Sequence, residues 1–427
     1  MEELTINAHQ VQEEVLGEIL KRNAETEYLK GFLNGQSGKQ LFKNNVPIVT
    51  YEDIKPYVDR IANGEPSDIL LAEPVIEFNR RCKFIASVFI FFFGFIGRPA
   101  SLLSRSCLTC SSGTSGGQPK LIPNTVELSK KRAAFHTLIA SVVNKHFGDL
   151  NRAGKSMELM FVKPEIETPS GLKARSVTTS LFKDNGFRDI LPMLYTSPVE
   201  TILCLDINQS MYCQLLVGLI QRDEVVRIGS MFASAFLRAI KFIEDHWKEL
   251  CSNIKTGYLS DWITDSGCKN ALSSIMKPDP ELADSIENIC GCRSWEGIIR
   301  KLWPKAKYIG AITTGVMRQY TTALDFYSGG LPLVSSFYAC SEAICGINLE
   351  PLDKPADVSY TILPNMAYFE FLPVKKDRVS MTQEVQFNGV SEQESIEMKS
   401  NNEDIEAVDL VNVKLGQFYE LVVTTFT

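Results

Sequence analysis

The sequence is poor in histidine and lacks any cysteine spacing typical of a metal site. Its 427 residues include 4 histidines and 11 irregularly spaced cysteines. Cys290 and Cys292 stand too close together for the usual zinc-binding pair, so we expect no zinc cluster. The mixed, charged N-terminal stretch does not resemble a secretory leader. Irregular cysteines without a leader indicate reduced thiols, and we predict a cytoplasmic protein.

Positively charged residues are also fewer than negatively charged ones. The chain has 44 Lys and Arg residues against 51 Asp and Glu, a net charge of -7 and a pI near 5.4. General binding of nucleic acid needs a basic surface, so we expect no nucleic-acid partner. The hydrophobic fraction of 44% and the charged fraction of 22% are ordinary for a globular protein. The length allows two or three domains with ample core, and we expect a monomer.

A membrane span is not expected either. Residues 84–97 carry no charge and include six phenylalanines, but the run is only fourteen residues long and Pro99 follows it closely. A helix that crosses a bilayer needs about 20 apolar residues. The segment is therefore predicted to be a buried strand or a buried helix; attachment to a membrane through it is the alternative.

The apolar patterns that are present predict an α/β architecture, since helical and strand-like runs alternate. Residues 1–60, 126–135, 209–221 and 231–250 have helical patterns. Short apolar runs predict strands at 156–161, 201–206, 308–313, 333–338, 367–372 and 418–426. Residues 375–405 are predicted to form a flexible acidic loop.

A hydroxyl-rich segment is the strongest functional signal. It contains Ser111, Ser112, Gly113, Thr114 and Ser115, and Lys120 closes it. Glycine lets the main chain approach an anion closely, and hydroxyls and backbone N–H groups can then surround a phosphate. The start of the helix that follows would add oriented donors. The segment therefore predicts a nucleotide site, and the missing Gly-Lys-Ser/Thr triplet disfavours a P-loop kinase or ATPase.

A second polar segment lies about 230 residues downstream, at Tyr338, Cys340, Ser341 and Glu342. An aromatic ring can cover the face of an adenine base. A glutamate beside it can hold Mg²⁺ against phosphate oxygens. The two segments together predict one site for a magnesium–nucleotide complex.

Together, the two segments resemble the first two signatures of adenylate-forming enzymes. Their residues are most similar to the plant acyl acid amido synthetases, the Gretchen Hagen three family. Further similar stretches are 209–212, 295–297, 303–307, 327–334 and 357–373. The resemblance covers nearly the whole chain apart from residues 79–107. It implies the large N-terminal domain of the adenylate-forming, firefly-luciferase-like fold, with mixed β-sheets, a β-barrel-like part and packed helices.

The resemblance also implies a reaction. A small carboxylic acid would attack ATP, with Mg²⁺ present, to give an acyl adenylate, and an amino acid would then displace AMP. The sequence around residues 209–225 and 247–265 is most similar to that of the auxin-conjugating branch. This implies indole-3-acetic acid as the acid and Asp or Glu as the amine, with the jasmonate- and benzoate-conjugating branches as alternatives.

Site residues are implied residue by residue. Phosphate contacts fall to the hydroxyl-rich segment at Ser111, Ser112, Gly113, Thr114 and Ser115. Tyr338 would lie against adenine, Cys340 and Ser341 near the nucleotide, and Glu342 on Mg²⁺; Ser111, Thr114 and Glu342 would be the catalytic groups. The substrate pockets would be lined by Phe135 and Phe337 and, near the amino acid, by Arg175, Val177, Thr178, Thr179 and Ser180.

The chain departs from the family pattern in three places. Residues 79–107 form an atypical apolar insert, which suggests a retained intron or an alternative gene model. Cys340 stands where the family usually has serine, and a thiol is a weaker hydrogen-bond donor. The chain stops at Thr427, before the family's small C-terminal lid domain, so we expect impaired activity. A remnant that binds acyl acid or nucleotide without catalysis is the alternative function.

Overall fold

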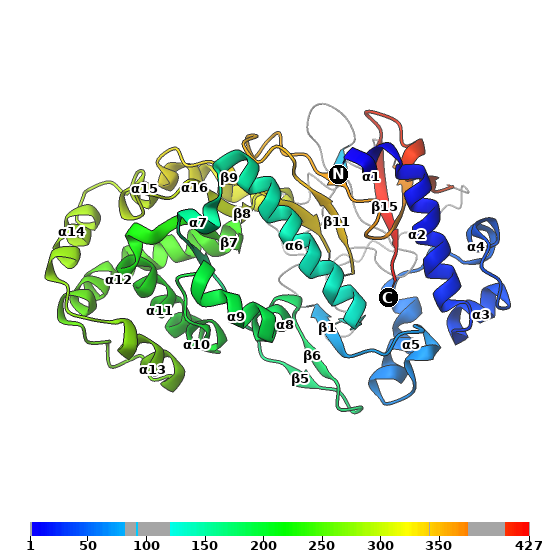
Figure 1. Cartoon of the computed structure of the whole chain (residues 1–427), viewed down its shortest axis with the longest axis horizontal. Helices are drawn as coiled ribbons and strands as arrows, with labels where there is room; N and C mark the ends of the chain where they lie inside the picture. The colour runs from blue at the N-terminus through cyan, green and yellow to red at the C-terminus, as the bar shows by residue number, and fades with distance from the viewer. Residues whose placement is uncertain (1, 82–90, 93–119, 341, 375–405, 427) are drawn as a thin grey trace, which may run out of the picture.

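The computed structural model describes residues 2–81, 91–92, 120–340, 342–374 and 406–426. Most of the predicted insert, the hydroxyl-rich segment at 111–115, Ser341 and nearly all of the predicted acidic loop lie outside these ranges. Within them the protein is a mixture of helices and four sheets (Figure 1). The predicted α/β class is therefore confirmed.

Helices dominate the described chain. Those of eight or more residues are α2 (Ala8–Asn23), α5 (Tyr51–Ala62), α6 (Val126–Phe147), α9 (Asn185–Leu194), α11 (Ile207–Ile220), α12 (Ala233–Thr256), α13 (Ser266–Ile275), α14 (Pro280–Cys290) and α16 (Thr321–Ser328). The shorter ones are α1 (Glu2–Ile6), α3 (Glu27–Leu33), α4 (Lys39–Asn45), α7 (Leu150–Ala153), α8 (Val177–Lys183), α10 (Val199–Leu203) and α15 (Ile298–Leu302). The helices predicted in 1–60, 209–221 and 231–250 are confirmed.

The described strands form four sheets. Their orders are β3-β1-β6-β5, β10-β11-β12, β14-β13-β15-β2 and β4-β7-β8-β9. The strands are β1 (Glu77–Arg81), β2 (Phe91–Phe92), β3 (Lys120–Asn124), β4 (Lys155–Leu159), β5 (Ile166–Glu167), β6 (Lys173–Arg175), β7 (Val225–Phe232), β8 (Ile309–Ile312), β9 (Leu333–Val334), β10 (Phe337–Ala339), β11 (Ile344–Ile347), β12 (Thr361–Ile362), β13 (Tyr368–Pro373), β14 (Val408–Asp409) and β15 (Phe418–Thr424).

One predicted strand is wrong. Residues 201–206 were expected to be extended, but Thr201 and Leu203 belong to the short helix α10. A brief apolar run has no period that separates a strand from a buried helical turn. The helix starts directly after Pro198, whose carbonyl oxygen accepts from Thr201 Oγ1 at 2.7 Å. The fixed φ of proline and this side-chain bond favour the helical start.

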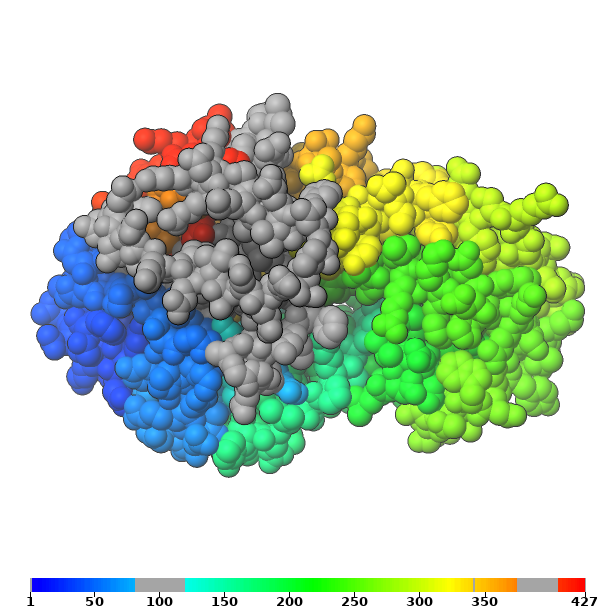
Figure 2. Space-filling view, turned by 180° about the vertical axis from the view of Figure 1, so that it is seen from behind, coloured from blue at the N-terminus to red at the C-terminus, as the bar shows by residue number. Residues whose placement is uncertain are grey.

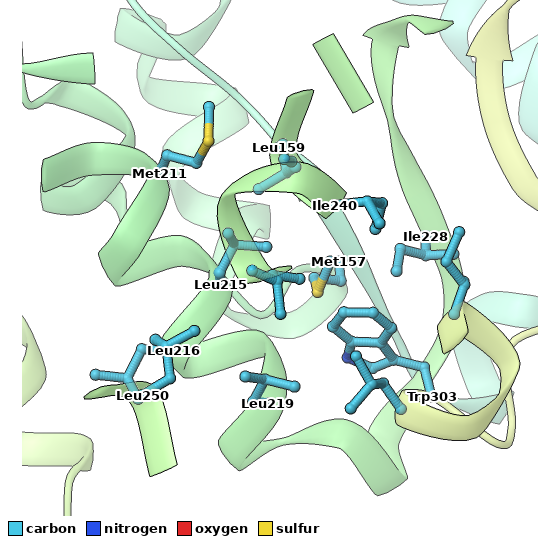
Figure 3. Close-up of a cluster of buried hydrophobic side chains, with 14 of the residues drawn as sticks. Met157, Leu159, Met211, Leu215, Leu216, Leu219, Ile228, Ile240, Leu250 and Trp303 are labelled. Atoms are coloured by element: carbon cyan, nitrogen blue, oxygen red, sulfur yellow. The ribbon is translucent and has the colours of Figure 1, made fainter. Parts of the chain in front are cut away.

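The sheet β4-β7-β8-β9 is parallel and carries the largest hydrophobic core on its helical side. Met157 and Leu159 from β4 face Leu215 and Leu219 from α11, with Trp303 beside them (Figure 3). α12 packs on β7 in the same layer. This helical region follows residue 200 and occupies one end of the molecule, while the N-terminal helices occupy the other (Figure 2).

Gly218 lets α11 pack closely on β4. A Cβ at this position would lie 2.3 Å from Met157 Sδ, which is enclosed in the core. The carbonyl oxygen of Gly218 also accepts from Trp303 Nε1 at 2.8 Å. A side chain here would displace buried neighbours, because interiors are close-packed.

The antiparallel sheets β10-β11-β12 and β14-β13-β15-β2 share a second core. Tyr338 and Cys345 from the first contact Phe369, Phe371 and residues of β15 from the second. The predicted run 333–338 is split between β9, in the parallel sheet, and β10, in this antiparallel one.

No helix among the described residues is both long enough and apolar enough to cross a membrane. Most of the Phe-rich run at 84–97 lies outside the described residues; Phe91 and Phe92 form the short strand β2.

Candidate functional site

The site is built on the antiparallel pair β1–β3, whose ends connect through the residues that include the hydroxyl-rich segment. Glu77 lies opposite Asn124, and Asn79 opposite Ile122. Side chains two apart on a strand share a face, so Glu77 and Asn79 point the same way. Glu77, Asn79 and Asn124 are all buried, with at most 4% of each exposed. Three buried polar side chains on neighbouring strands must find partners, since an unpaired buried polar group costs roughly 1–3 kcal/mol.

Glu77 is the centre of this polar group. Its Oε1 accepts from Asn124 Nδ2 at 2.9 Å and from Ser180 Oγ, and its Oε2 accepts from Arg175 Nε at 2.7 Å. Arg175 ends β6, which runs parallel to β1, and Ser180 lies in α8. The structure therefore brings two residues of the predicted amino-acid pocket, Arg175 and Ser180, onto one buried carboxylate.

The helix α6 brings a guanidinium to the same place. Thr125 caps the helix by accepting from Leu128 N at 3.3 Å, and α6 then runs across the middle of the molecule (Figure 1). Arg132, in its second turn, donates to Asn124 Oδ1 at 3.2 Å. With the Asn79 amide turned so that its oxygen faces the guanidinium, Asn79 also accepts from Nη1 and Nη2, at 3.1 and 3.2 Å.

Arg132 connects this polar group to the second predicted segment. Burial lowers the pKa of Arg132. Cys340 lies nearby, and the negative charges of Glu77 and Glu342 oppose that shift. Guanidinium stays protonated in proteins, so a positive charge sits between β1 and the β10–β11 hairpin.

The hairpin between β10 and β11 positions Glu342. Cys340 N donates to the carbonyl oxygen of Ala343 at 2.8 Å, and Ala343 N donates to Cys340 Sγ at 3.2 Å, which closes a tight turn. A hydrogen bond with Cys345 and burial both raise the pKa of the Cys340 thiol, so it is neutral at pH 7. The thiol of Cys340 thus accepts a hydrogen bond that stabilises the turn. Ser341 lies outside the described residues. Glu342 is 5% exposed.

A cavity of about 80 Å³ lies where these segments meet. Its lining includes Glu342, Leu121–Pro123 of β3, which directly follows the hydroxyl-rich segment, and Thr424 at the end of β15. Most of the other lining residues are apolar and come from α2 to α5: Ile19, Leu20, Asn23, Tyr28, Leu29, Phe42, Val46, Tyr51 and Ile54. The space is smaller than a ligand pocket, which typically measures about 300–1,000 Å³. It nevertheless places Glu342 and the strand after the hydroxyl-rich segment on one cavity.

Lys120 also takes a defined position at the start of β3. Its Nζ lies 4.9 Å from the ring centroid of Tyr51 and 3.5 Å from Glu52 Oε1. The Tyr51 hydroxyl accepts from Leu121 N at 2.8 Å. α5 therefore fixes the strand that the hydroxyl-rich segment enters.

The aromatic residues assigned to ligand contacts are packed in the protein. Tyr338 is only 2% exposed, and its ring lies 5.9 Å from that of Tyr360. Phe135 makes an edge-to-face contact with Phe337, at 5.9 Å between ring centroids. Residues three apart on a helix share a face, so Arg132 and Phe135 both point toward the hairpin. Whether Tyr338 covers adenine and whether Phe135 and Phe337 touch substrate stay predictions.

The remaining residues of the predicted amino-acid pocket begin α8. Ser176 caps this helix, and its Oγ accepts from Thr179 N at 3.2 Å. Thr179 is fully buried and accepts from Lys163 N at 2.9 Å, so it holds the neighbouring loop. Val177 and Thr178 are half-buried in the first turn. Thr179 thus bonds within the protein, whereas Val177 and Thr178 keep accessible surface; contact of these residues with the amino acid stays a prediction.

Sequence reasoning did not single out Glu77, Asn79, Asn124 and Arg132 as site residues. A signal was present, because Glu77 and Asn79 place polar groups two apart in a strand-like run. Asn124 follows the apolar residues of β3 just before a helix cap. Nothing in either pattern says that the two strands pair, so the group is visible only in the fold.

The described residues fit a magnesium–nucleotide complex in the type of their donors. Glu342 offers a carboxylate with both oxygens enclosed, on the lining of the cavity. Carboxylate oxygen is a preferred ligand of Mg²⁺. Arg132 supplies a positive charge within reach of the same hairpin, as an anionic ligand requires. The hydroxyl-rich segment at 111–115 lies outside the described residues.

Comparison with known families supports the resemblance. Residues 1–80 and 104–333 match the GH3 family N-terminal domain, and residues 360–427 match the GH3 family central domain. The unmatched residues 81–103 fall inside the insert predicted at 79–107.

Individual relatives match over the whole chain. Indole-3-acetic acid-amido synthetase GH3.17 of Arabidopsis thaliana is 50% identical over 434 residues, which cover 100% of this chain and 65% of that protein. Indole-3-acetic acid-amido synthetase GH3.15 of the same plant is 49% identical over 432 residues, covering 100% and 64%. The chain thus spans about 65% of the length of these relatives.

A solved structure agrees with the sequence comparison. The structure described as AtGH3.15 acyl acid amido synthetase in complex with 2,4-DB superposes with a TM-score of 0.79 at 47% identity. The match covers 100% of this chain and 64% of that one.

Proposed function

This chain belongs to the GH3 family, and from that premise we propose that it joins a small carboxylic acid to an amino acid through an acyl adenylate made from ATP. The observation that carries the proposal is the position of Arg132. Its guanidinium is hydrogen-bonded beside β1–β3 and close to Glu342 on the hairpin. Two segments that lie far apart in the sequence thus share one charged site.

The proposed reaction has two steps. A carboxylate oxygen of the acid attacks the α-phosphorus of ATP, a new oxygen–phosphorus bond forms, and pyrophosphate leaves. The amine of the amino acid then attacks the activated carbonyl carbon, the amide bond forms, AMP leaves, and the amine proton passes to solvent. The first step brings a carboxylate to a polyanion, and the second develops negative charge on the carbonyl oxygen, so positive charge and preorganised donors lower both barriers.

Each residue has a proposed part in this chemistry. Glu342 would hold Mg²⁺, which neutralises charge on the phosphates when bound. Arg132 would orient anionic oxygens near the hairpin. Ser111 and Thr114 would donate hydroxyls to phosphate oxygens, as the family resemblance implies.

Indole-3-acetic acid is the proposed acid. Support comes from the names of the relatives in Arabidopsis thaliana, which are called indole-3-acetic acid-amido synthetases. The solved GH3.15 structure contains 2,4-DB, so at least one relative accommodates another ligand. Jasmonate and benzoate remain comparison substrates for the test.

Aspartate or glutamate is the proposed amine. Arg175 and Lys183 place two cations around α8, near the predicted amino-acid pocket. Both cations already pair with Glu165, at 3.4 and 3.0 Å, so support for this amine comes from the family resemblance rather than from unpaired charge at the pocket.

Exchange of labelled pyrophosphate into ATP tests the first step without requiring the second. We expect exchange that needs Mg²⁺ and an acid, and that is faster with indole-3-acetic acid than with jasmonate or benzoate. Arg132→Met should slow exchange at least tenfold. Arg152→Met, which removes a 90% exposed arginine side chain on α7, should leave it unchanged.

Absence of exchange with every acid, while ATP still binds, would overturn the ligase proposal and favour a non-catalytic binding protein. Equal pyrophosphate exchange in the two arginine variants would mean that Arg132 does not take part in the first step.

A further inference from the structure

A buried cluster of thiols lies outside the site described above. Cys204 is the C-cap that follows α10, Cys213 lies in α11 and Cys268 lies in the first turn of α13. All three are buried, with Cys213 and Cys268 fully enclosed. Three short stretches of chain therefore bring their sulfur atoms into one part of the core.

The cluster also contains a carboxylate. Cys204 Sγ, Cys268 Sγ and a carboxylate oxygen of Asp265 all lie within 4.8 Å of one another. Cys213 is a hydrogen-bonding neighbour of Cys268. A buried free cysteine ordinarily behaves as a small apolar side chain. Three thiols grouped around a carboxylate form a donor set that apolar packing does not require.

We propose that Cys204, Asp265 and Cys268, with Cys213 as the fourth ligand, form a zinc site that ties α10, α11 and α13 together. Zn²⁺ takes four ligands in a tetrahedron, at about 2.3 Å from sulfur and about 2.0–2.2 Å from carboxylate oxygen. Those lengths place ligand atoms about 3.5–3.8 Å apart. The ligand atoms of Cys204, Asp265 and Cys268, which lie within 4.8 Å of one another, need only small side-chain movements to reach that geometry.

The surroundings already orient the ligands. Asp265 Oδ1 accepts from Cys268 N at 2.8 Å, which fixes the carboxylate beside the sulfur atoms. Gln209 Oε1 accepts from Thr264 N at 2.7 Å and from Asp265 N at 2.8 Å, so α11 holds the loop before α13. Outer hydrogen bonds of this kind fix metal ligands in place.

Charge and access also suit a cation. Asp265, the N-cap of the ten-residue helix α13, supplies a negative charge beside the thiols. Cys204 is 6% exposed and the next residue, Leu205, is 66% exposed, so the cluster lies close to the surface. The spacing of the cysteines along the chain conceals the site, since positions 204, 213 and 268 match no compact zinc motif.

The test measures metal in the full chain as purified and after titration with ZnCl2 or CoCl2. We expect one tightly bound Zn²⁺ per chain, and, with Co²⁺, the thiolate-to-cobalt charge-transfer band of a tetrahedral sulfur-rich site. Zn²⁺ should also raise the thermal midpoint of the wild-type chain, and a chelator should lower it.

Three variants complete the test. Asp265→Asn keeps a side-chain oxygen for the helix cap but removes the charged ligand, so Zn²⁺ affinity should fall at least tenfold. Cys268→Ser should abolish the charge-transfer band. Cys292→Ser, at an exposed cysteine, should bind metal like the wild type.

Wild-type protein that binds no stoichiometric Zn²⁺ and gives no charge-transfer band would overturn the proposal, with no variant needed. A Cys204–Cys268 disulfide found by mass spectrometry in freshly purified protein would also overturn it. So would Asp265→Asn or Cys268→Ser protein that binds Zn²⁺ as tightly as the wild type.

Discussion

Replacing Glu77 by glutamine should loosen the strands that carry the site. Glu77 accepts three hydrogen bonds through its two oxygens, and one comes from the guanidinium of Arg175. Glutamine keeps the volume but removes the charge and turns one acceptor into a donor. Hydrogen bonds to a charged group contribute roughly 1.5–3 kcal/mol each. Glu165 lies 3.4 Å from Arg175 and would still pair with it, which offsets part of the stability lost with the Glu77 charge. We expect a net cost of about 3 kcal/mol.

Hydrogen exchange read by mass spectrometry measures this cost locally, which suits a chain of this size because global unfolding need not be two-state. A cost of about 3 kcal/mol corresponds to roughly 100-fold faster exchange in β1, β3 and β6. Glu165→Gln is the matched control. Glu165 contacts the same arginine, but its side chain is 27% exposed against 5% for Glu77. A partly exposed pair contributes about 1 kcal/mol or less, so exchange should rise less than about fivefold.

Equal exchange in the two glutamate variants would refute the reasoning. It would mean that burial of Glu77 adds nothing to its bond with Arg175, and that the polar group on β1–β3 does not hold the strands.

Two further predictions concern stability. Burial raises the pKa of Glu158 to about 8, with Arg227 opposing the shift, so the folded state binds the proton more tightly than the unfolded chain. The free energy of unfolding should therefore fall as pH rises from about 4.5 to about 8. Thermal midpoints measured across this pH range should fall less steeply in Glu158→Gln than in the wild type. The same dependence of midpoint on pH in both proteins would contradict the prediction. Trp303 is fully enclosed and donates to Gly218 O, so Trp303→Ala should cost about 4 kcal/mol and Trp303→Phe about half as much in urea titrations. Equal midpoints for the wild type and Trp303→Ala would contradict it.

The sequence allows the main helices and the family to be predicted because those signals are local or long. The 3.6-residue pattern of Phe236, Ile240 and Ile243 needs no knowledge of partners, and α12 contains all three. The stretch at 201–206 was wrong because a short apolar run has no such period. Whether it becomes strand or helix depends on Pro198 and on packing against α11 and α13.

The site was only partly predictable. Glu342, Arg175 and Ser180 were chosen from motifs, and the structure places all three on or beside one buried polar group. Glu77 and Arg132 were missed because their importance depends on which strands pair and which face of α6 meets the hairpin. Pairing across long stretches of sequence leaves no local pattern.

The central claim is that Glu342 and the strand following the hydroxyl-rich segment belong to one site for magnesium-bound ATP. The most direct test of this claim is calorimetric titration of ATP into the wild type, once with Mg²⁺ and once with a chelator. The variants Glu342→Gln and Glu350→Gln are titrated in parallel. Glu350 follows in the same region with a 72% exposed side chain, so its variant is the control. We predict that the wild type and Glu350→Gln bind ATP equally well in the presence of Mg²⁺. ATP affinity should fall at least tenfold in Glu342→Gln, and also in the wild type when Mg²⁺ is removed. Binding of ATP to Glu342→Gln as tight as to the wild type, or no binding to the wild type, would contradict the claim.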